Sequence, residues 1–174
     1  MSGDDRFPRL LTNPGTLGDD RGRIQILYEN DHMVLKRSSS TVGVFRGLHR
    51  QAVPYLQDKI IRVLSGKIID FVTNPDDASD PIHYSVITPA DDWVHIASHL
   101  AHGFYALEDV VFEYFCDGGY NEAAEESYFV APAVTRAFDL ETIHVSDKDQ
   151  NGIPMDRPFV ARPGTADVKA IMNV

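Results

Sequence analysis

The segment 46–51 (RGLHRQ) combines side chains that could bind an anion and move a proton. The planar guanidinium of Arg46 suits phosphate, and the imidazole of His49 can exchange a proton near neutral pH. In an extended segment alternate side chains share a face, so these two face opposite ways unless a bend at Gly47 re-aims them. His49 is equally compatible with a plain core or surface histidine that makes one hydrogen bond.

A second segment, residues 95–104, contains three histidines and raises the question of a metal site. Metal-binding small barrels use converging histidine and carboxylate ligands, commonly with a His-x-His pair on one strand. That pair is missing, and we expect His99 and His102 to lie in a turn. These histidines therefore do not predict a metal site.

A third segment carries Tyr114, spaced by two from Phe112 and from Cys116, so the three side chains share one face of a strand. A tyrosine inside a barrel can be core packing with a satisfied hydroxyl or a general acid, and its position leaves both open. A fourth segment, 145–154, is rich in Asp and Lys and by composition alone describes a solvated loop.

The charge distribution indicates where an anion could bind. The net charge of −10 and the pI of about 5.0 disfavour a nucleic-acid partner. Between residues 68 and 134 there is no Lys or Arg, while five basic residues gather just before: Arg46, Arg50, Lys59, Arg62 and Lys67. This pattern favours a local site for a small anion such as a phosphorylated metabolite, although a solvated basic face is the simpler interpretation.

The elements that must position these residues are mostly short strands. Runs rich in β-branched and aromatic residues, separated by turn residues, predict strands at 24–28, 33–36, 59–64, 67–72, 83–88, 93–96, 103–107, 110–116 and 128–130. The apolar runs around Ser65-Gly66 predict a tight hairpin. We expect short helices only at 121–126 and 165–172, and an irregular tail after Pro132. The fold class is therefore an all-β sandwich or barrel.

Length and composition describe one domain over residues 1–174. Hydrophobic residues make up 43% and charged residues 24%, as in ordinary globular proteins. No apolar run is long enough to cross a bilayer, and the N-terminus lacks the apolar core of a signal peptide. The single cysteine, Cys116, excludes an intrachain disulfide. We therefore expect a cytoplasmic protein with no membrane partner.

The ordered set of segments resembles the nucleotide-sugar 3,5-epimerase family. That family has an Arg-Gly-Leu-His-x-Gln segment, a following Lys, an Asp-x-Val strand, an Ala-His-Gly-Phe segment, a Tyr pair and a late Leu-Ser-x-Lys-Asp. The matching stretches are 46–51, 57–59, 66–70, 101–104, Tyr114 with Tyr120, and 146–149. The resemblance runs from about residue 20 to 154. It implies a cupin-like jelly roll and a homodimer that exchanges strands.

The resemblance also implies a substrate and roles for the matching residues. The substrate is a nucleoside diphosphate-linked 4-keto-6-deoxy sugar, whose C3 or C5 is inverted through an enolate without a metal or redox cofactor. His49 would be the base, Asp149 its partner, Tyr114 the acid on the other face, and Lys59 the cation at the enolate oxygen. Arg21 and Arg46 would hold the diphosphate. Four further residues would contact the sugar or the nucleotide: Gln57, His102, Glu125 and Lys148.

Some positions depart from the family pattern. The aromatic residue and the Glu that read thymine in the family correspond here to Ile24 and Ile26, which cannot make a polar contact to a base. A Gln and an Asn of the family become Val34 and Lys36. The resemblance therefore supports the reaction class better than the identity of the nucleotide as dTDP. The substrate could carry another nucleotide, or a heptose in place of a hexose. Inversion at C3, at C5 or at both stays open.

Three alternatives share the fold. A 3,4-ketoisomerase would act on a similar substrate with paired histidines and would not need Tyr114 and Asp149. A non-catalytic sugar-binding module would need neither an acid nor a base. A metal-dependent cupin would need the histidine ligands that the second segment does not provide.

Overall fold

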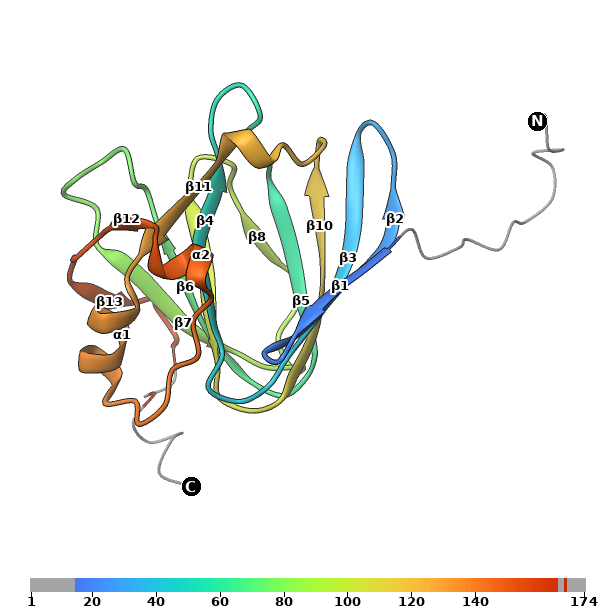
Figure 1. Ribbon diagram of the computed structural model, residues 1–174. Coiled ribbons are helices and arrows are strands. Elements are labelled where there is room, and N and C mark those ends of the chain that lie inside the picture. Colours follow the sequence, from blue (N-terminus) through green and yellow to red (C-terminus); the bar gives the residue numbers. More distant parts are fainter. Residues whose placement is uncertain (1–14, 166–167, 169–174) are drawn as a thin grey trace, which may run out of the picture.

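Two curled β-sheets face each other and form most of the molecule (Figure 1). The computed structural model describes residues 15–165 and residue 168. The six-stranded sheet has the order β1 (Gly15–Asp19), β2 (Gly22–Glu29), β3 (Met33–Ser40), β10 (Val110–Asp117), β5 (Lys59–Ser65), β8 (Val94–Ile96). The seven-stranded sheet has the order β12 (Ile153–Pro154), β11 (Glu125–Phe129), β4 (Phe45–Gln51), β9 (Ala101–Ala106), β6 (Ile68–Thr73), β7 (Ile82–Ile87), β13 (Phe159–Ala161). The predicted all-β, jelly-roll type of fold is confirmed.

The predicted hairpin at Ser65-Gly66 is wrong, because the two strands that flank it belong to different sheets. β5 pairs with β10 and β8, whereas β6 pairs with β9 and β7. Gly66 has φ +77°, and a Cβ there would lie 2.2 Å from the carbonyl oxygen of Asp109. A short turn between apolar runs does not reveal whether the chain pairs with itself or crosses to the facing sheet.

The tail after Pro132 is more regular than predicted. Helix α1 (Ala131–Phe138) begins with Pro132 in its first turn, where the missing N–H costs nothing. It is followed by α2 (Asp147–Gln150), and then β12 and β13 extend the two edges of the seven-stranded sheet with parallel pairings. The apolar residues of α1 span only two turns, which is too short a stretch for helical periodicity to stand out in the sequence.

The two predicted helices fare differently. The helix at 121–126 is confirmed only in part: a 3-10 helix, η1 (Glu122–Ala124), covers its middle and leads directly into β11, whose Glu125 pairs with Gln51 of β4. Pairing with β4 therefore prevails over helical propensity there. The helix expected at 165–172 falls almost wholly outside the described residues. No helix in the described part of the chain is long and apolar enough to span a membrane.

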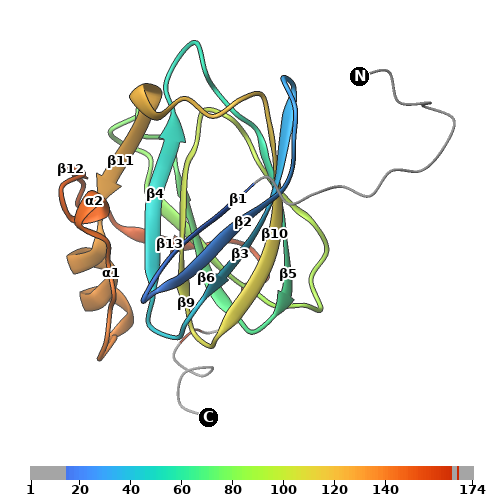
Figure 2. The same ribbon diagram turned by 45° about the vertical axis from the view of Figure 1, so that its right-hand side comes forward.

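The core consists of two apolar clusters on opposite faces of the seven-stranded sheet. One cluster packs α1 against the outer face of that sheet, where Figures 1 and 2 both place the helix, with Phe71 and Phe138 in edge-to-face contact. The other cluster lies between the sheets and includes Ile61, Phe104 and Phe112. Burial on both faces explains why every residue of β9 is buried. The inner cluster forms the floor of the cavity described next.

Candidate active site

A single cavity of about 420 Å³ lies between the two sheets and is within the size range of small-molecule sites. It is lined by all ten residues that the sequence singled out. They come from both sheets, from the β1–β2 turn, from the loop between β4 and β5, and from α2: Arg21, Arg46, His49, Gln57, Lys59, His102, Tyr114, Glu125, Lys148 and Asp149. The structure thus brings together residues that lie up to 128 positions apart in the sequence (21 to 149).

Strand β4 bends so that both Arg46 and His49 face the cavity, which simple alternation along a strand would not allow. The pairing of β4 with β9 shifts register between these two residues. Gly47 has φ +112°, and a Cβ on it would lie 2.7 Å from the Cα of Gly103. The bend anticipated at Gly47 is therefore present, and it depends on two glycines that let the backbones touch.

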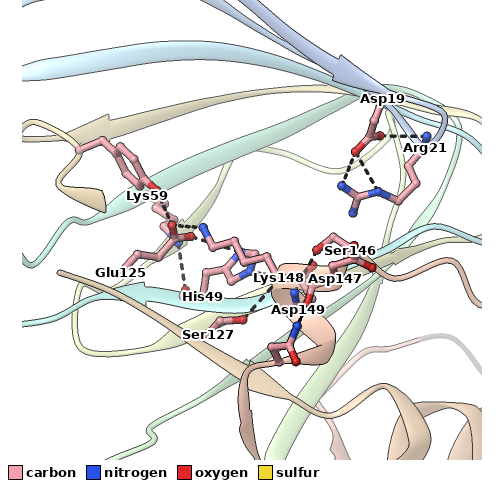
Figure 3. A network of polar contacts seen from close by, with 12 residues as sticks. Asp19, Arg21, His49, Lys59, Glu125, Ser127, Ser146, Asp147, Lys148 and Asp149 are labelled. Atoms are coloured by element: carbon pink, nitrogen blue, oxygen red, sulfur yellow. Dashed lines mark hydrogen bonds and ion pairs between the residues drawn. The ribbon is translucent and has the colours of Figure 1, made fainter. Parts of the chain in front are cut away.

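His49 and Asp149 form a close pair on one wall of the cavity (Figure 3). Nε2 of His49 lies 2.5 Å from Oδ1 of Asp149, which is only 2% exposed. The backbone N–H of Asp149 donates to Oγ of Ser146, the residue that caps α2. Burial raises the pKa of Asp149, but hydrogen bonds from His49, Ser146 and the Gly47 amide outweigh it and lower the pKa overall.

The ionised state of Asp149 fixes the histidine tautomer. A carboxylate can only accept hydrogen bonds, so the proton of His49 resides on Nε2 and leaves Nδ1 as an acceptor. Nδ1 lies 3.8 Å from Oε1 of Glu125, at the cavity. A histidine held in this way can take up a proton and share the resulting charge with Asp149.

Tyr114 lies on the facing wall, because β10 belongs to the six-stranded sheet and β4 to the seven-stranded one. Its ring packs against Phe112, with centroids 5.7 Å apart, and Nζ of Lys36 lies 5.9 Å from its centroid. Burial and the nearby Cys116 thiol raise the pKa of Tyr114 well above its usual value. The phenol is therefore protonated at neutral pH and carries a proton that it could donate.

Lys59 on β5 places an ammonium beside the histidine. Its Nζ donates to the backbone oxygen of His49 at 3.2 Å. Burial lowers the pKa of Lys59, and the negative charges of Glu125 and Asp70 oppose that shift. The arrangement puts an imidazole, a phenol and an ammonium around one cavity, the geometry that acid–base chemistry on a carbonyl compound requires.

Two arginines add positive charge to the cavity. Nε of Arg46 donates to Oγ of Ser40 at 3.0 Å, and burial followed by the charge of Arg21 lowers the pKa of Arg46. Arg21 is held by Asp19, to which its Nε donates at 3.1 Å. Two guanidinium groups that face one cavity without a full complement of carboxylates favour an anionic ligand.

Only part of the basic stretch that the sequence showed belongs to this cavity. Arg50 lines it together with Arg46 and Lys59. Arg62 points away and lies over the ring of Trp93, 5.8 Å from its centroid, and Lys67 pairs with Glu108. Because successive residues of β5 alternate between the cavity and the outer face, a run of basic residues cannot all serve one site.

Glu125, Gln57 and Lys148 take part in a polar network at the cavity edge. Glu125 Oε2 accepts hydrogen bonds from the Tyr120 hydroxyl and from Nζ of Lys148. The Gln57 amide donates to the backbone oxygen of Gly118 at 3.0 Å. Most of these hydrogen-bonding groups are drawn from loops and element ends, where sequence patterns carry little positional information.

His99 lies in a turn as expected, whereas His102 lies on β9, so the expectation is wrong for His102. Its Nε2 lies 2.5 Å from Oδ1 of Asp70, a residue of β6 that is fully buried. His95 pairs with Asp58 outside the cavity, at 2.9 Å. Across residues 15–165 and 168, no group of three or more His, Cys, Asp or Glu side chains is arranged to hold a metal ion.

The sequence reasoning did not assign a role to Asp70. A lone carboxylate within the apolar run IIDFV of β6 was the signal that could have found it, because buried charges are rare unless they are paired. Its second partner, Arg162, follows β13 and carried no signal at all. The cavity wall also includes Leu17, Ile24 and Ile26, which give it an apolar side.

Comparison with known proteins places the chain in a family. A family model described as dTDP-4-dehydrorhamnose 3,5-epimerase matches residues 9–156, most of the chain. The chain belongs to the dTDP-4-dehydrorhamnose 3,5-epimerase family. This membership makes it an isomerase of the sugar-nucleotide epimerase class. The resemblance seen in the sequence is thereby confirmed.

Individual members of the family are similar at a moderate level. The dTDP-4-dehydrorhamnose 3,5-epimerase of Shigella flexneri is 28% identical over 162 residues, covering 82% of this chain and 88% of that enzyme. The Escherichia coli enzyme is 32% identical over 124 residues, covering 60% of this chain. The chain spans 65% of the length of the Escherichia coli enzyme and likewise of the Mycobacterium tuberculosis enzyme.

Solved structures agree with the fold. A dTDP-6-deoxy-D-glucose-3,5-epimerase from Legionella pneumophila, in complex with dTDP-4-keto-L-rhamnose, is 26% identical with a TM-score of 0.60, over 85% of this chain and 91% of that one. ChmJ, a 3′-monoepimerase from Streptomyces bikiniensis, has a TM-score of 0.61 at 23% identity, over 82% of this chain and 81% of that one. The second likeness concerns the fold alone.

Proposed function

We propose that this chain inverts C3, C5 or both of a nucleoside diphosphate-linked 4-keto-6-deoxy sugar by proton transfer. The observation that carries the proposal is the position of His49 and Tyr114 on facing walls of one cavity, with Lys59 beside the histidine. Inversion of a carbon needs a base on one face and an acid on the other. A binding module would need neither.

The 4-keto group acidifies the neighbouring C–H bonds. Nδ1 of His49 removes a proton and leaves an enolate, while Asp149 stabilises the imidazolium that forms. The ammonium of Lys59 stabilises the enolate oxygen. Tyr114 then delivers its proton from the opposite wall, after which water returns a proton to the phenolate and takes up the one that His49 holds.

Binding of the nucleotide part uses the remaining cavity residues. Arg21 and Arg46 hold the diphosphate, where planar guanidinium groups can make two parallel hydrogen bonds. Ile24 and Ile26 line the same cavity and offer only apolar contact. We therefore propose that the base is held by shape and stacking rather than by hydrogen bonds from these positions, and that dTDP is not the only candidate nucleotide.

The reaction that we propose uses no metal. We expect that treatment with EDTA, followed by removal of the chelator, will leave kcat and KM unchanged. Loss of activity that is restored by an added divalent metal would contradict this and would favour a metal-dependent cupin.

We also propose that the protein acts as a homodimer, as the family resemblance implies. We expect light scattering coupled to gel filtration to give a mass of about twice 19.4 kDa in solution. Elution at the mass of one chain would contradict the dimer without affecting the chemistry proposed above.

The decisive experiment is incubation in deuterated water with several nucleotide-linked 4-keto-6-deoxy sugars, followed by NMR at C3 and C5. Incorporation of deuterium with inversion supports the proposal and identifies the position that reacts. A 3-keto product would indicate a ketoisomerase, and absence of label with every sugar would indicate a non-catalytic binding module.

A further inference from the structure

We propose that Arg162 is a positioning residue of this site: it anchors Asp70 and thereby keeps His102 as a neutral hydrogen-bond acceptor for a substrate hydroxyl. Arg162 itself does not line the cavity. Its effect passes through one buried carboxylate to a histidine that does.

A continuous series of contacts leads from Arg162, in the C-terminal part of the chain, through Asp70 to the cavity. Oδ1 of Asp70 lies 2.5 Å from Nε2 of His102, and Oδ2 of the same carboxylate accepts from a guanidinium nitrogen of Arg162. Asp70 has no exposed surface, and the His102 side chain is 9% exposed. The carboxylate is therefore shared between a cation on one side and an imidazole on the other.

The charges decide which group carries the proton. An ionised carboxylate buried without a cation would draw a proton onto the nearest imidazole. Arg162 supplies that cation, so His102 does not have to. Burial lowers the pKa of His102, the charge of Asp70 opposes this, and the positive charges of Lys59 and Arg162 lower it further. Burial raises the pKa of Asp70, but the hydrogen bond from His102 and the charge and hydrogen bond of Arg162 lower it overall, which favours the ionised carboxylate.

A neutral His102 has a defined tautomer. Because the ionised Asp70 can only accept, Nε2 of His102 carries the proton and Nδ1 has a free lone pair. A charged His102 would instead present only donors. Since His102 lines the cavity, the proton state that Arg162 maintains decides whether this wall accepts a hydrogen bond from a sugar hydroxyl or donates one.

Arg162 is held firmly although it lies outside the segment that the family model matches. Its backbone N–H donates to the oxygen of Tyr84 at 2.8 Å, directly after β13 has paired with β7. Phe159 of β13 packs on Phe138 with centroids 5.4 Å apart. Nε of Arg162 is buried with no hydrogen-bond partner among residues 15–165 and 168. Burying an unpaired donor is unfavourable, and the ion pair with Asp70 is the contact that offsets this cost.

The test compares Arg162→Met with Arg162→Lys, which keeps the charge. Nitrogen-15 NMR of the histidines in the full chain, without substrate, reports the tautomer and protonation of His102 directly. We expect Arg162→Met to protonate His102 at a pH about one unit higher than in the wild type. The lysine variant is expected to restore most of the wild-type behaviour. Arg162→Gln serves as a second variant if the methionine variant does not fold.

Arg157→Gln is the matched control. Arg157 belongs to the same tail and donates to Thr73 and to the backbone oxygens of Asn74, Pro75 and Asp80, but it does not reach the cavity. Its loss loosens the tail and should leave the pH at which His102 is protonated unchanged. A protonation pH that shifts equally in both variants would overturn the inference, because loosening of the tail would then explain the shift.

The kinetic part of the test rests on the proposed epimerase function. The Arg162→Met variant should lose about tenfold to 100-fold in kcat/KM, with the acid limb of its pH profile moved to higher pH. A folded variant with the wild-type His102 state and pH profile would overturn the inference. If the NMR change occurs but the wild type epimerises no sugar, the proposed function fails and the role of Arg162 stands.

Discussion

Two histidines that line the same cavity each lie 2.5 Å from a carboxylate, and we propose different purposes for them. Asp149 receives its other hydrogen bonds from neutral groups, the Ser127 hydroxyl among them, so its charge is available to stabilise an imidazolium at His49. Asp70 is already paired with Arg162. At the residue scale, one arginine therefore distinguishes a histidine that can take a proton from one that stays neutral.

Replacement of the proposed base tests this directly. In His49→Asn the side chain keeps its size and polarity but cannot take up a proton, so deuterium exchange into the substrate falls by about 10²-fold to 10⁴-fold. Binding of the substrate, measured by calorimetry, changes little.

His95→Asn is the control, since His95 also pairs with an aspartate but lies outside the cavity. Exchange at the wild-type rate in His49→Asn would show that another group removes the proton.

Tyr114→Phe separates removal of a proton from its return. Without the hydroxyl, His49 still forms the enolate, so exchange at the carbon continues from the histidine face while inversion falls by about 10²-fold or more. Deuterium NMR and the stereochemistry of the product measure the two steps in one sample. Tyr105→Phe is the control, because its hydroxyl bonds to Thr142 away from the cavity. Equal loss of exchange and inversion would contradict the assignment of Tyr114 as the acid.

At the scale of elements, the close pairing of β4 with β9 positions Arg46 and His49 at the cavity. A methyl group on Gly47 would lie 2.7 Å from Gly103 Cα and 2.8 Å from the His102 oxygen, at a φ that side chains rarely adopt. We expect Gly47→Ala to lower the free energy of unfolding by about 2 kcal/mol or more, measured by urea denaturation, and to reduce activity further in the molecules that fold.

Gly119→Ala is the matched control, since nothing lies within 4 Å of a Cβ there. A Gly47→Ala variant with wild-type stability and activity would show that the bend in β4 tolerates a side chain.

The sequence predicted the residues of the site better than the path of the chain. The Arg-Gly-Leu-His, Ala-His-Gly-Phe and Ser-x-Lys-Asp stretches indicated their side chains chiefly through the family resemblance, and those side chains do meet in one cavity. The prediction of a hairpin at Ser65-Gly66 was wrong because strand periodicity indicates which face of a strand is buried and not which strand lies beside it. Asp70 and Arg162 were missed because their partnership joins residues 92 positions apart.

At the scale of the whole molecule, an acidic chain surrounds a cationic cavity. The net charge is −10, yet guanidinium and ammonium groups gather between the sheets. The buried carboxylates of Asp70 and Asp149 compensate part of this positive charge and so lower the cost of burying it. Stability and ligand binding are therefore linked through the same few ionised groups, and acid should disturb both.

The linkage predicts how stability depends on pH. Folding lowers the pKa of His102 below its ordinary value of about 6.5, so the unfolded chain binds a proton more readily than the folded one as the pH falls below that point. The free energy of unfolding therefore declines with a slope of up to about 1.4 kcal/mol per pH unit for this one group. Asp70 and Asp149, whose pKa values are also lowered, add to the decline only below about pH 4.

Urea denaturation between pH 5 and 6.5 separates the histidines from the carboxylates, which remain ionised in both states across most of that window, and the comparison with His102→Gln then isolates His102. His102→Gln is less stable than the wild type at neutral pH, since Asp70 loses part of its hydrogen bonding, but its stability falls less steeply with acid. If the variant kept the wild-type slope, the proton taken up on unfolding would belong to another group, and the neutral state of His102 on which the role of Arg162 depends would be wrong.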